Sequence, residues 1–134
     1  MDFGINNFFD IKYKSSKIGH YQDLEHIDGL SISTVSCGLY EKKRDDLVFF
    51  YFREGANYAN VYTQSKLVSE NIKWNKKIKE KKIFGILINT RNANAMTGKN
   101  GYNSLKNIST NLSKLLNEKQ NSDEDFPKNI KPNQ

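Results

Sequence analysis

The chain has 134 residues, 37% of them hydrophobic, and its 21 lysines and arginines exceed its 15 aspartates and glutamates, which gives a formal net charge of +6. This length favours one compact domain with a modest core. The longest apolar run, Ile83–Ile88, is far shorter than the roughly 20 residues that cross a bilayer, so no membrane-spanning helix is expected. Met1–Phe9 lacks a basic start before an apolar stretch, and the single Cys37 fits a reducing compartment, so we predict a cytoplasmic protein.

The first half of the chain is predicted to contain two strands. Residues 1–19 show little pattern and are expected to form an irregular lead-in. Apolar and polar residues alternate over 30–35, which predicts a half-buried strand. The β-branched and aromatic run Leu47–Phe52 predicts a buried strand. Residues 55–57 are expected to break this strand before an extended pattern resumes over Tyr58–Thr63.

The second half is predicted to contain two helices and one strand. Apolar residues among lysines over Ser69–Lys82 predict a short and weak amphipathic helix. The continuous apolar run Ile83–Asn89 predicts a strand that is buried on both faces. After a polar loop, leucine and isoleucine at three- and four-residue steps predict the strongest helix, Tyr102–Asn117. Residues 118–134 are rich in charges and amides and are predicted to be a disordered tail.

These elements predict an α/β fold of the layered α+β type, with a mixed sheet and one strong helix. The folded portion is expected to span residues 20–117. One good helix is too few to cover two buried strands, because each buried face of a sheet needs a layer packed on it. The sequence therefore suggests that part of the fold is missing.

Neither the histidines nor the cysteine forms a pattern that favours catalysis or metal binding. His20 and His26 are six residues apart, and no second pair of ligands follows them. We predict ordinary surface or half-buried histidines and no metal. Cys37 needs a neighbouring base to act as a nucleophile, so a small buried residue is the simpler expectation.

A cluster of lysines crowds one segment of the chain. Its members are Lys66, Lys73, Lys76, Lys77, Lys79, Lys81 and Lys82. A solvated helix face is the ordinary interpretation of such a cluster. The alternative is a small basic nucleic-acid-binding module, in which Trp74 and Tyr62 would stack on bases. No nucleic-acid motif accompanies the lysines, so nucleic acid is not the favoured partner.

The most unusual segment is NTRNANAMTGKNG, residues 89–101, which joins a predicted strand to the strongest helix. Asparagine amides can tie loop backbone groups together, and Gly98 and Gly101 allow backbone angles that other residues avoid. The first amides of the following helix can face an anion. This is not a phosphate loop, since no hydroxyl residue follows Lys99. The residues alone predict either a structured loop beside a pocket or a purely structural turn.

This segment resembles the signature of the ornithine acetyltransferase family, also called glutamate N-acetyltransferases. In that family a strand ends in asparagine and runs into a loop of the form N-A-N-A-x-T-G, which matches Asn89–Gly98 here. Tyr58–Gln64 and the stretch from Arg44 to Ala56 are similar to further family segments in the same order. Met96 stands where the family often has cysteine, and Ser69–Ile72 replaces its alanine-proline-valine step. The resemblance covers residues 20–117.

The resemblance implies a partial α-β-β-α domain and an acyl transfer. Family members move an acetyl group from N-acetylornithine to glutamate within arginine biosynthesis; some also use acetyl-CoA as a co-substrate, and no cofactor is implied. A threonine freed by self-cleavage is the nucleophile, and a threonine-glycine pair stabilises the oxyanion. In this chain the resemblance marks only scaffold residues close to the site. They are Asn89, Asn92, Asn94, Thr97 and Gly98.

The chain lacks the segments that carry the family's chemistry. No serine-threonine-glycine segment, lysine-glycine run or self-cleaving threonine follows the last predicted helix, and Thr97-Gly98 matches the asparagine motif instead of the oxyanion pair. We therefore expect no catalytic residue and an inactive fragment, whose partner is the C-terminal portion or a second chain of the same enzyme. A truncation, a frameshift, a divergent ending and a non-catalytic family partner are all compatible with the sequence.

Overall fold

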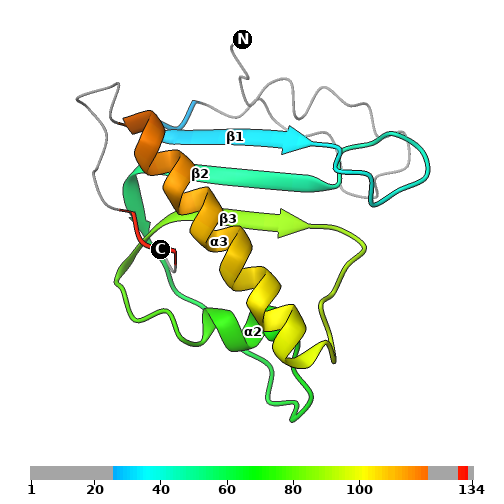
Figure 1. The fold of residues 1–134 in the computed structure, drawn as a ribbon. Helices are drawn as coiled ribbons and strands as arrows, with labels where there is room; N and C mark the ends of the chain where they lie inside the picture. The colour runs from blue at the N-terminus through cyan, green and yellow to red at the C-terminus, as the bar shows by residue number, and fades with distance from the viewer. Residues whose placement is uncertain (1–25, 121–129, 133–134) are drawn as a thin grey trace, which may run out of the picture.

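A computed structural model describes residues 26–120 and 130–132 of the chain. The predicted lead-in at residues 1–19 lies outside the described residues, as do His20 and most of the predicted tail. The described part contains a three-stranded sheet and two helices. One helix runs diagonally across a face of the sheet (Figure 1).

The sheet is antiparallel, and its middle strand pairs with both of its neighbours in the chain. The strands are β1, Leu30–Val35, β2, Leu47–Asn57, and β3, Lys82–Asn89. Their order in the sheet is β1-β2-β3 (Figure 1). The register places Ile32 opposite Phe50 and Phe50 opposite Ile86. Alternate residues of β1 are half-buried, which agrees with the alternation in the sequence.

Strand β2 is longer than the sequence predicts. A break is expected at residues 55–57, but the strand continues through them and pairs Ala56 with Ile83. Gly55 accommodates a shift of register at this point, because its φ of +72° is a conformation that glycine adopts without steric cost. The extended pattern predicted over 58–63 forms no strand.

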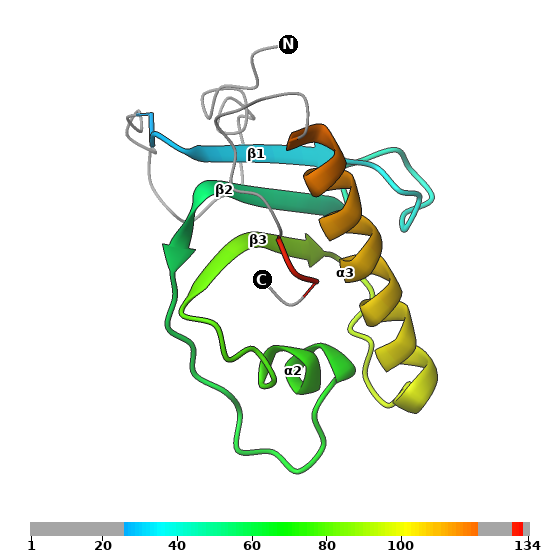
Figure 2. The same ribbon diagram turned by 60° about the vertical axis from the view of Figure 1, so that its left-hand side comes forward.

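The helices differ in length from the predicted ones. They are α2, Glu70–Asn75, and α3, Gly98–Gln120. Helix α2 covers only part of the predicted 69–82, and Ser69 before it makes no side-chain cap hydrogen bond. Helix α3 extends beyond the predicted 102–117 at both ends. Figure 2 shows α2 beside the first turns of α3, away from the sheet.

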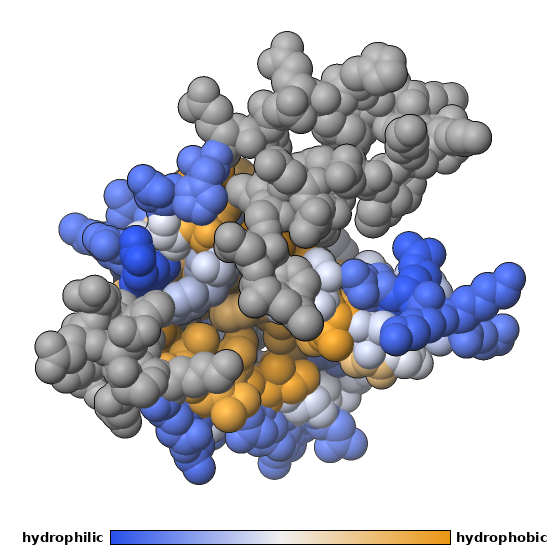
Figure 3. All heavy atoms as spheres, turned by 90° about the horizontal axis from the view of Figure 1, so that it is seen from above, coloured by the Kyte–Doolittle hydropathy of each residue, from blue (hydrophilic) through white to orange (hydrophobic). Residues whose placement is uncertain are grey.

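The hydrophobic core of the described residues is small. Ile83 and Ile130 are the buried hydrophobic residues there, whereas Ile86, Leu87 and Ile88 of β3 are 39%, 39% and 49% exposed. The burial predicted for both faces of this strand is therefore wrong. The reason is that neither described helix covers the far face of the sheet (Figures 1 and 2). Apolar side chains consequently gather on the molecular surface, as Figure 3 shows from above.

The fold class is α+β, as predicted from the sequence. The sheet formed by the described residues is antiparallel throughout, whereas a mixed sheet was expected. Across residues 26–120 and 130–132, no helix has the length and apolar character needed to cross a membrane.

The described end of the chain returns to helix α3. Asn117 Nδ2 donates to the carbonyl oxygen of Ile130 at 3.0 Å, and the Ile130 N–H donates to Asn117 Oδ1 at 2.9 Å. Ile130 itself is buried. This part of the segment predicted as a tail is thus held by a two-point hydrogen bond and by apolar burial.

Candidate functional site

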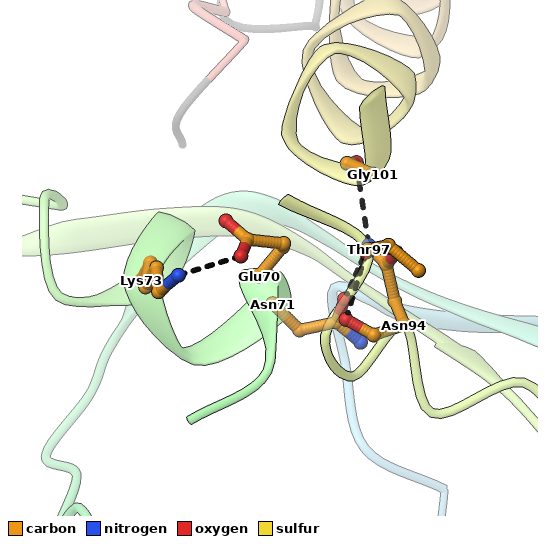
Figure 4. A network of polar contacts seen from close by, with 6 residues as sticks. All are labelled: Glu70, Asn71, Lys73, Asn94, Thr97 and Gly101. Carbon is orange, nitrogen blue, oxygen red and sulfur yellow. Dashed lines mark hydrogen bonds and ion pairs between the residues drawn. The ribbon is translucent and has the colours of Figure 1, made fainter. Parts of the chain in front are cut away.

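The asparagine loop, defined here as residues 89–101, leaves the end of β3 and enters α3. Its first part is anchored to the sheet, because the Thr90 N–H donates to the carbonyl oxygen of Asp46 at 2.9 Å. Arg91 Nη1 donates to the carbonyl oxygen of Leu39 at 3.1 Å, which ties the loop to the connection between β1 and β2. Figure 4 shows the rest of the loop between α2 and the first turn of α3.

Asn94 is the centre of the loop's hydrogen bonds. Its Nδ2 donates to Asn71 Oδ1 at 3.1 Å and to the carbonyl oxygen of Gly101 at 3.3 Å. Its Oδ1 accepts a hydrogen bond of 2.6 Å from Thr97 Oγ1, and its carbonyl oxygen accepts one of 3.1 Å from the Glu70 N–H. One half-buried amide therefore joins the loop to the starts of both helices (Figure 4).

The two earlier asparagines shape the beginning of the loop. Asn89 Nδ2 donates to the carbonyl oxygen of Asn92 at 3.0 Å and to that of Thr90 at 3.3 Å. Asn92 Oδ1 accepts from the N–H of Asn94 at 3.1 Å. This is the local side-chain to backbone bonding for which asparagine is favoured in turns.

The backbone of the loop takes the left-handed conformation repeatedly. Arg91, Asn94 and Met96 have φ values of 65°, 49° and 58°, and Gly98 has 59°. Residues other than glycine and asparagine seldom adopt such angles, so the hydrogen bonds around Asn94 must compensate a conformational cost at Arg91 and Met96. The loop is therefore a defined structure and not an extended linker.

Gly101 is required by a close approach and not by its backbone angle. A Cβ atom at this position would lie 1.9 Å from Thr97 Oγ1 and 2.3 Å from Asn94 Oδ1, both inside atomic contact distance. Sequence reasoning considered Gly101 only for backbone freedom. The signal available was its place three residues after the asparagine motif, which says nothing about which side chains it meets.

The structure joins four of the five residues marked by the family resemblance in one continuous set of hydrogen bonds. Asn89, Asn92, Asn94 and Thr97 bond to one another or to each other's backbone. Gly98 begins α3, and the space around its Cα is open. These amide and hydroxyl groups orient backbone, and they include no nucleophile activated by a base.

A groove lies beside the loop, between α2 and the start of α3. Its volume is about 550 Å³, and we call it the lysine groove. It is lined by Glu70, Lys73, Lys76, Lys77, Gly98, Lys99 and Tyr102. Sequence reasoning grouped Lys73, Lys76 and Lys77 with four other lysines that do not line the groove, and it missed Lys99 because that residue comes from a different element.

The two aromatic residues considered for base stacking make contacts within the protein. The Trp74 ring lies 5.5 Å from the Tyr102 ring at an angle of 55°. Lys76 Nζ lies 5.4 Å from the centre of the Tyr62 ring. Both rings therefore have a neighbour within the protein, and neither residue lines the lysine groove.

Cys37 is exposed, so its expected burial is wrong, and its partner is the buried Asp46. Asp46 Oδ1 accepts from Cys37 Sγ at 2.9 Å and from the Cys37 N–H at 2.7 Å, and Oδ2 accepts from the Leu39 N–H at 2.7 Å. The thiol hydrogen bond lowers the pKa of Asp46 and raises the pKa of Cys37. A thiol kept protonated in this way is a poor nucleophile, and the carboxylate serves to close the loop.

His26 forms a contact of 3.2 Å with Asp28 at an exposed position. In the parts of the chain that the structure describes, no three side chains of histidine, cysteine, aspartate or glutamate lie close enough to hold a metal ion.

Two solved structures are similar to this fold. Arginine biosynthesis bifunctional protein ArgJ from Bacillus halodurans has a TM-score of 0.57 and 27% identity, over 63% of this chain and 46% of that one. Ornithine acetyltransferase from Mycobacterium tuberculosis, determined in complex with ornithine, has a TM-score of 0.63 over 68% of this chain and 48% of that one. Its identity of 18% shows likeness of fold alone.

Sequence comparison gives a consistent result. The ArgJ protein of Bartonella henselae is 32% identical over 101 residues, which are 75% of this chain and 25% of that protein. The ArgJ protein of Bradyrhizobium diazoefficiens is 35% identical over 83 residues, which are 61% of this chain and 20% of that protein. This chain thus spans a quarter or less of the length of these relatives. The ArgJ family model matches residues 31–124, and the chain therefore belongs to the ArgJ family.

Proposed function

We propose that residues 20–117 are the N-terminal scaffold of a cytoplasmic acetyltransferase of arginine biosynthesis. The complete enzyme would transfer the acetyl group of N-acetylornithine to glutamate, and acetyl-CoA is a second acetyl donor in this proposal. The 134 residues alone would be inactive, because the nucleophile and the oxyanion-stabilising groups belong to the remainder of the enzyme or to a second chain of it.

The hydrogen-bond network of Asn94 is the observation that carries this proposal. It holds the end of β3, Glu70 and Asn71 of α2, and Gly101 of α3 in one arrangement (Figure 4). A network of this kind positions backbone rigidly, which an acyl-transfer site requires of the elements around it. In the proposal, Asn89, Asn92, Asn94, Thr97 and Gly98 form a wall next to the reacting groups without taking part in the chemistry.

The exposed apolar residues of β3 also support the proposal. Ile86, Leu87 and Ile88 follow one another, so their side chains point alternately to the two faces of the sheet. Their exposure leaves apolar area uncovered on both faces. The remaining layers of an α-β-β-α domain would cover that area, which accounts for apolar residues that this part of the chain cannot bury by itself.

A chimera tests the function. In the ArgJ protein of Bartonella henselae, the segment that aligns with this chain would be replaced by the corresponding residues of this chain, and the release of ornithine from N-acetylornithine in the presence of glutamate would be measured. We expect turnover by the chimera and none by the 134 residues alone. A second chimera that exchanges only residues 89–101 keeps the test informative if the larger exchange fails to fold.

Two results would contradict the proposal. One is a loop chimera that melts as cooperatively as its parent but has lost turnover, since the asparagine loop would then not fit the site. The other is turnover by the isolated chain, since the chemistry would then reside in groups that we place elsewhere. The matched control is the unaltered parent enzyme, assayed under the same conditions.

A further inference from the structure

The lysine groove presents positive charge from two separate elements. Lys76 and Lys77 follow α2, and Lys99 is in the first turn of α3. Lys73 also lines the groove, but its Nζ lies 2.6 Å from Oε1 of Glu70, whose side chain is 5% exposed. The lysine and the carboxylate neutralise each other. Three positive charges therefore remain without an ion-pair partner among the described residues.

The start of α3 adds to this positive field. Its first turn contains no acidic residue, and Gly98 and Lys99 at its beginning line the groove. The first amide N–H groups of a helix lack intrahelical acceptors and form the positive end of its dipole. The space around the Gly98 Cα is open, so a ligand can approach the backbone there.

The wall of the groove is held in place before any ligand arrives. Lys77 Nζ donates to Tyr102 Oη at 3.0 Å and lies 4.4 Å from the centre of the Tyr102 ring. Trp74 packs against the same Tyr102 ring, with 5.5 Å between the ring centres. A lysine fixed in this way loses less freedom on binding than a lysine that extends into solvent.

We propose that the lysine groove binds a small ligand that carries two or more phosphate groups. Lysines from two elements line the groove, which suits a ligand with more than one anionic group, and about 550 Å³ lies within the range of small-molecule sites. Nucleic acid fits less well, because neither Trp74 nor Tyr62 lines the groove, and Trp74 packs against Tyr102 within the protein. Acetyl-CoA, the second acetyl donor in the function proposed above, carries phosphate groups and falls in this ligand class, but binding of pyrophosphate or ADP to the groove does not depend on the acyl-transfer function.

The test uses the 134-residue chain with inorganic pyrophosphate, orthophosphate, ADP and a single-stranded RNA as probes. Trp74 is the only tryptophan and contacts Tyr102 in the groove wall, so its fluorescence reports binding, with calorimetry as a second readout. The K76Q/K77Q/K99Q variant removes the three uncompensated charges. The K42Q/K43Q/K114Q variant removes the same charge from positions outside the groove and is the matched control, since Lys114 lies more than three helical turns beyond Tyr102.

We expect pyrophosphate and ADP to bind more tightly than orthophosphate, and the groove variant to bind pyrophosphate at least about tenfold more weakly. The control variant should change the affinity by less than about twofold, because exposed charges beyond a Debye length are screened. Lys99→Gln alone should weaken binding without lowering the melting temperature, since the exposed Lys99 side chain forms no hydrogen bond or ion pair with another described residue.

Three results would overturn the proposal. Equal affinities for pyrophosphate and orthophosphate would indicate a single weak anion contact. Equal weakening in the groove and control variants would indicate attraction by net charge alone. Binding of single-stranded RNA that pyrophosphate cannot displace would indicate a nucleic-acid surface. Because no acyl substrate is present, none of these results bears on the chimera experiment.

Discussion

The asparagine loop and strand β3 are consecutive in the sequence, but they differ in how their side chains are accommodated: those of the loop form hydrogen bonds, and those of the strand are incompletely buried. The polar groups of the loop form hydrogen bonds with residues a few positions away or on α2. The Asn94 side chain by itself bonds to Asn71, Thr97 and Gly101. The apolar side chains of β3 remain partly exposed. The difference shows that the hydrogen bonds of the loop are formed within this part of the chain, whereas its two helices leave apolar side chains of β3 partly uncovered.

The largest loss of stability is expected when Gly101 is replaced by alanine. The new methyl group would meet Thr97 Oγ1 and Asn94 Oδ1 and force the network apart. We expect the free energy of unfolding to fall by about 3 kcal/mol, as for other overpacked positions. Urea denaturation of the isolated chain measures this. Gly98→Ala is the control, because a Cβ there meets nothing within 4 Å. Only its positive φ should then lower the free energy of unfolding, by about 1 kcal/mol.

Removing the Asn94 side chain tests the network itself. Asn94→Ala leaves the Asn71 side chain without its partner and removes the donor to the Gly101 carbonyl oxygen. It also removes the nearer acceptor of the Thr97 hydroxyl, which keeps the carbonyl oxygen of residue 94 at 3.2 Å. We expect a loss of about 2 kcal/mol in the free energy of unfolding, since partly buried polar groups are left unpaired. Asn103→Ala, at an exposed position of α3, should change stability by less than about 0.5 kcal/mol. Equal losses in the two variants would mean that the network does not stabilise the loop.

A polar substitution in β3 addresses the other side of the comparison. Leu87 is 39% exposed, so Leu87→Ser should cost only about 1 kcal/mol of stability, less than a change in a packed core. The same change should reduce the binding of a hydrophobic dye and the tendency of the isolated chain to associate, as measured by dye fluorescence and light scattering. A loss as large as that of Gly101→Ala would show that the strand is already well packed.

The smallest effect is expected from acid. The hydrogen bonds from Cys37 lower the pKa of Asp46, so the ionised carboxylate stabilises the fold above the ordinary aspartate pKa of about 3.9. This contribution is lost as the pH falls through the lowered pKa of the folded state. The melting temperature should therefore drop on acidification, and Asp46→Asn should show a shallower drop. Similar slopes for both proteins would mean that Asp46 does not control the acid response.

Much of the fold follows from local patterns in the sequence. Alternation predicts β1, the aromatic run predicts β2, and three- and four-residue spacing predicts α3. The burial of β3 is not predicted correctly. A continuous apolar run indicates a strand whose side chains favour burial, but it does not show whether other elements pack on its two faces. The continuation of β2 through Gly55 is missed for a related reason, since glycine in a strand signals either an end or a shift of register.

The site is predicted less completely than the fold. The asparagine motif marks a segment that forms a hydrogen-bonded loop in the structure, and four of the five residues marked by the family resemblance bond together there. The partners that lie far away in sequence, Glu70 and Asn71, could not be found, because only the packing of α2 against α3 brings them to Asn94. The lysine groove is likewise formed by two elements, so the sequence alone does not show that Lys99 lies beside the lysines near α2.

The hydrogen bonds of Thr90 and Arg91 have a consequence for how the molecule opens. They tie the asparagine loop to Asp46 and Leu39, in the segment between β1 and β2. Two loops joined in this way cannot open independently without breaking shared bonds. The hydrogen-bonded amides of both loops should therefore exchange with solvent through a common opening of one free energy, as one cooperative unit at this end of the sheet.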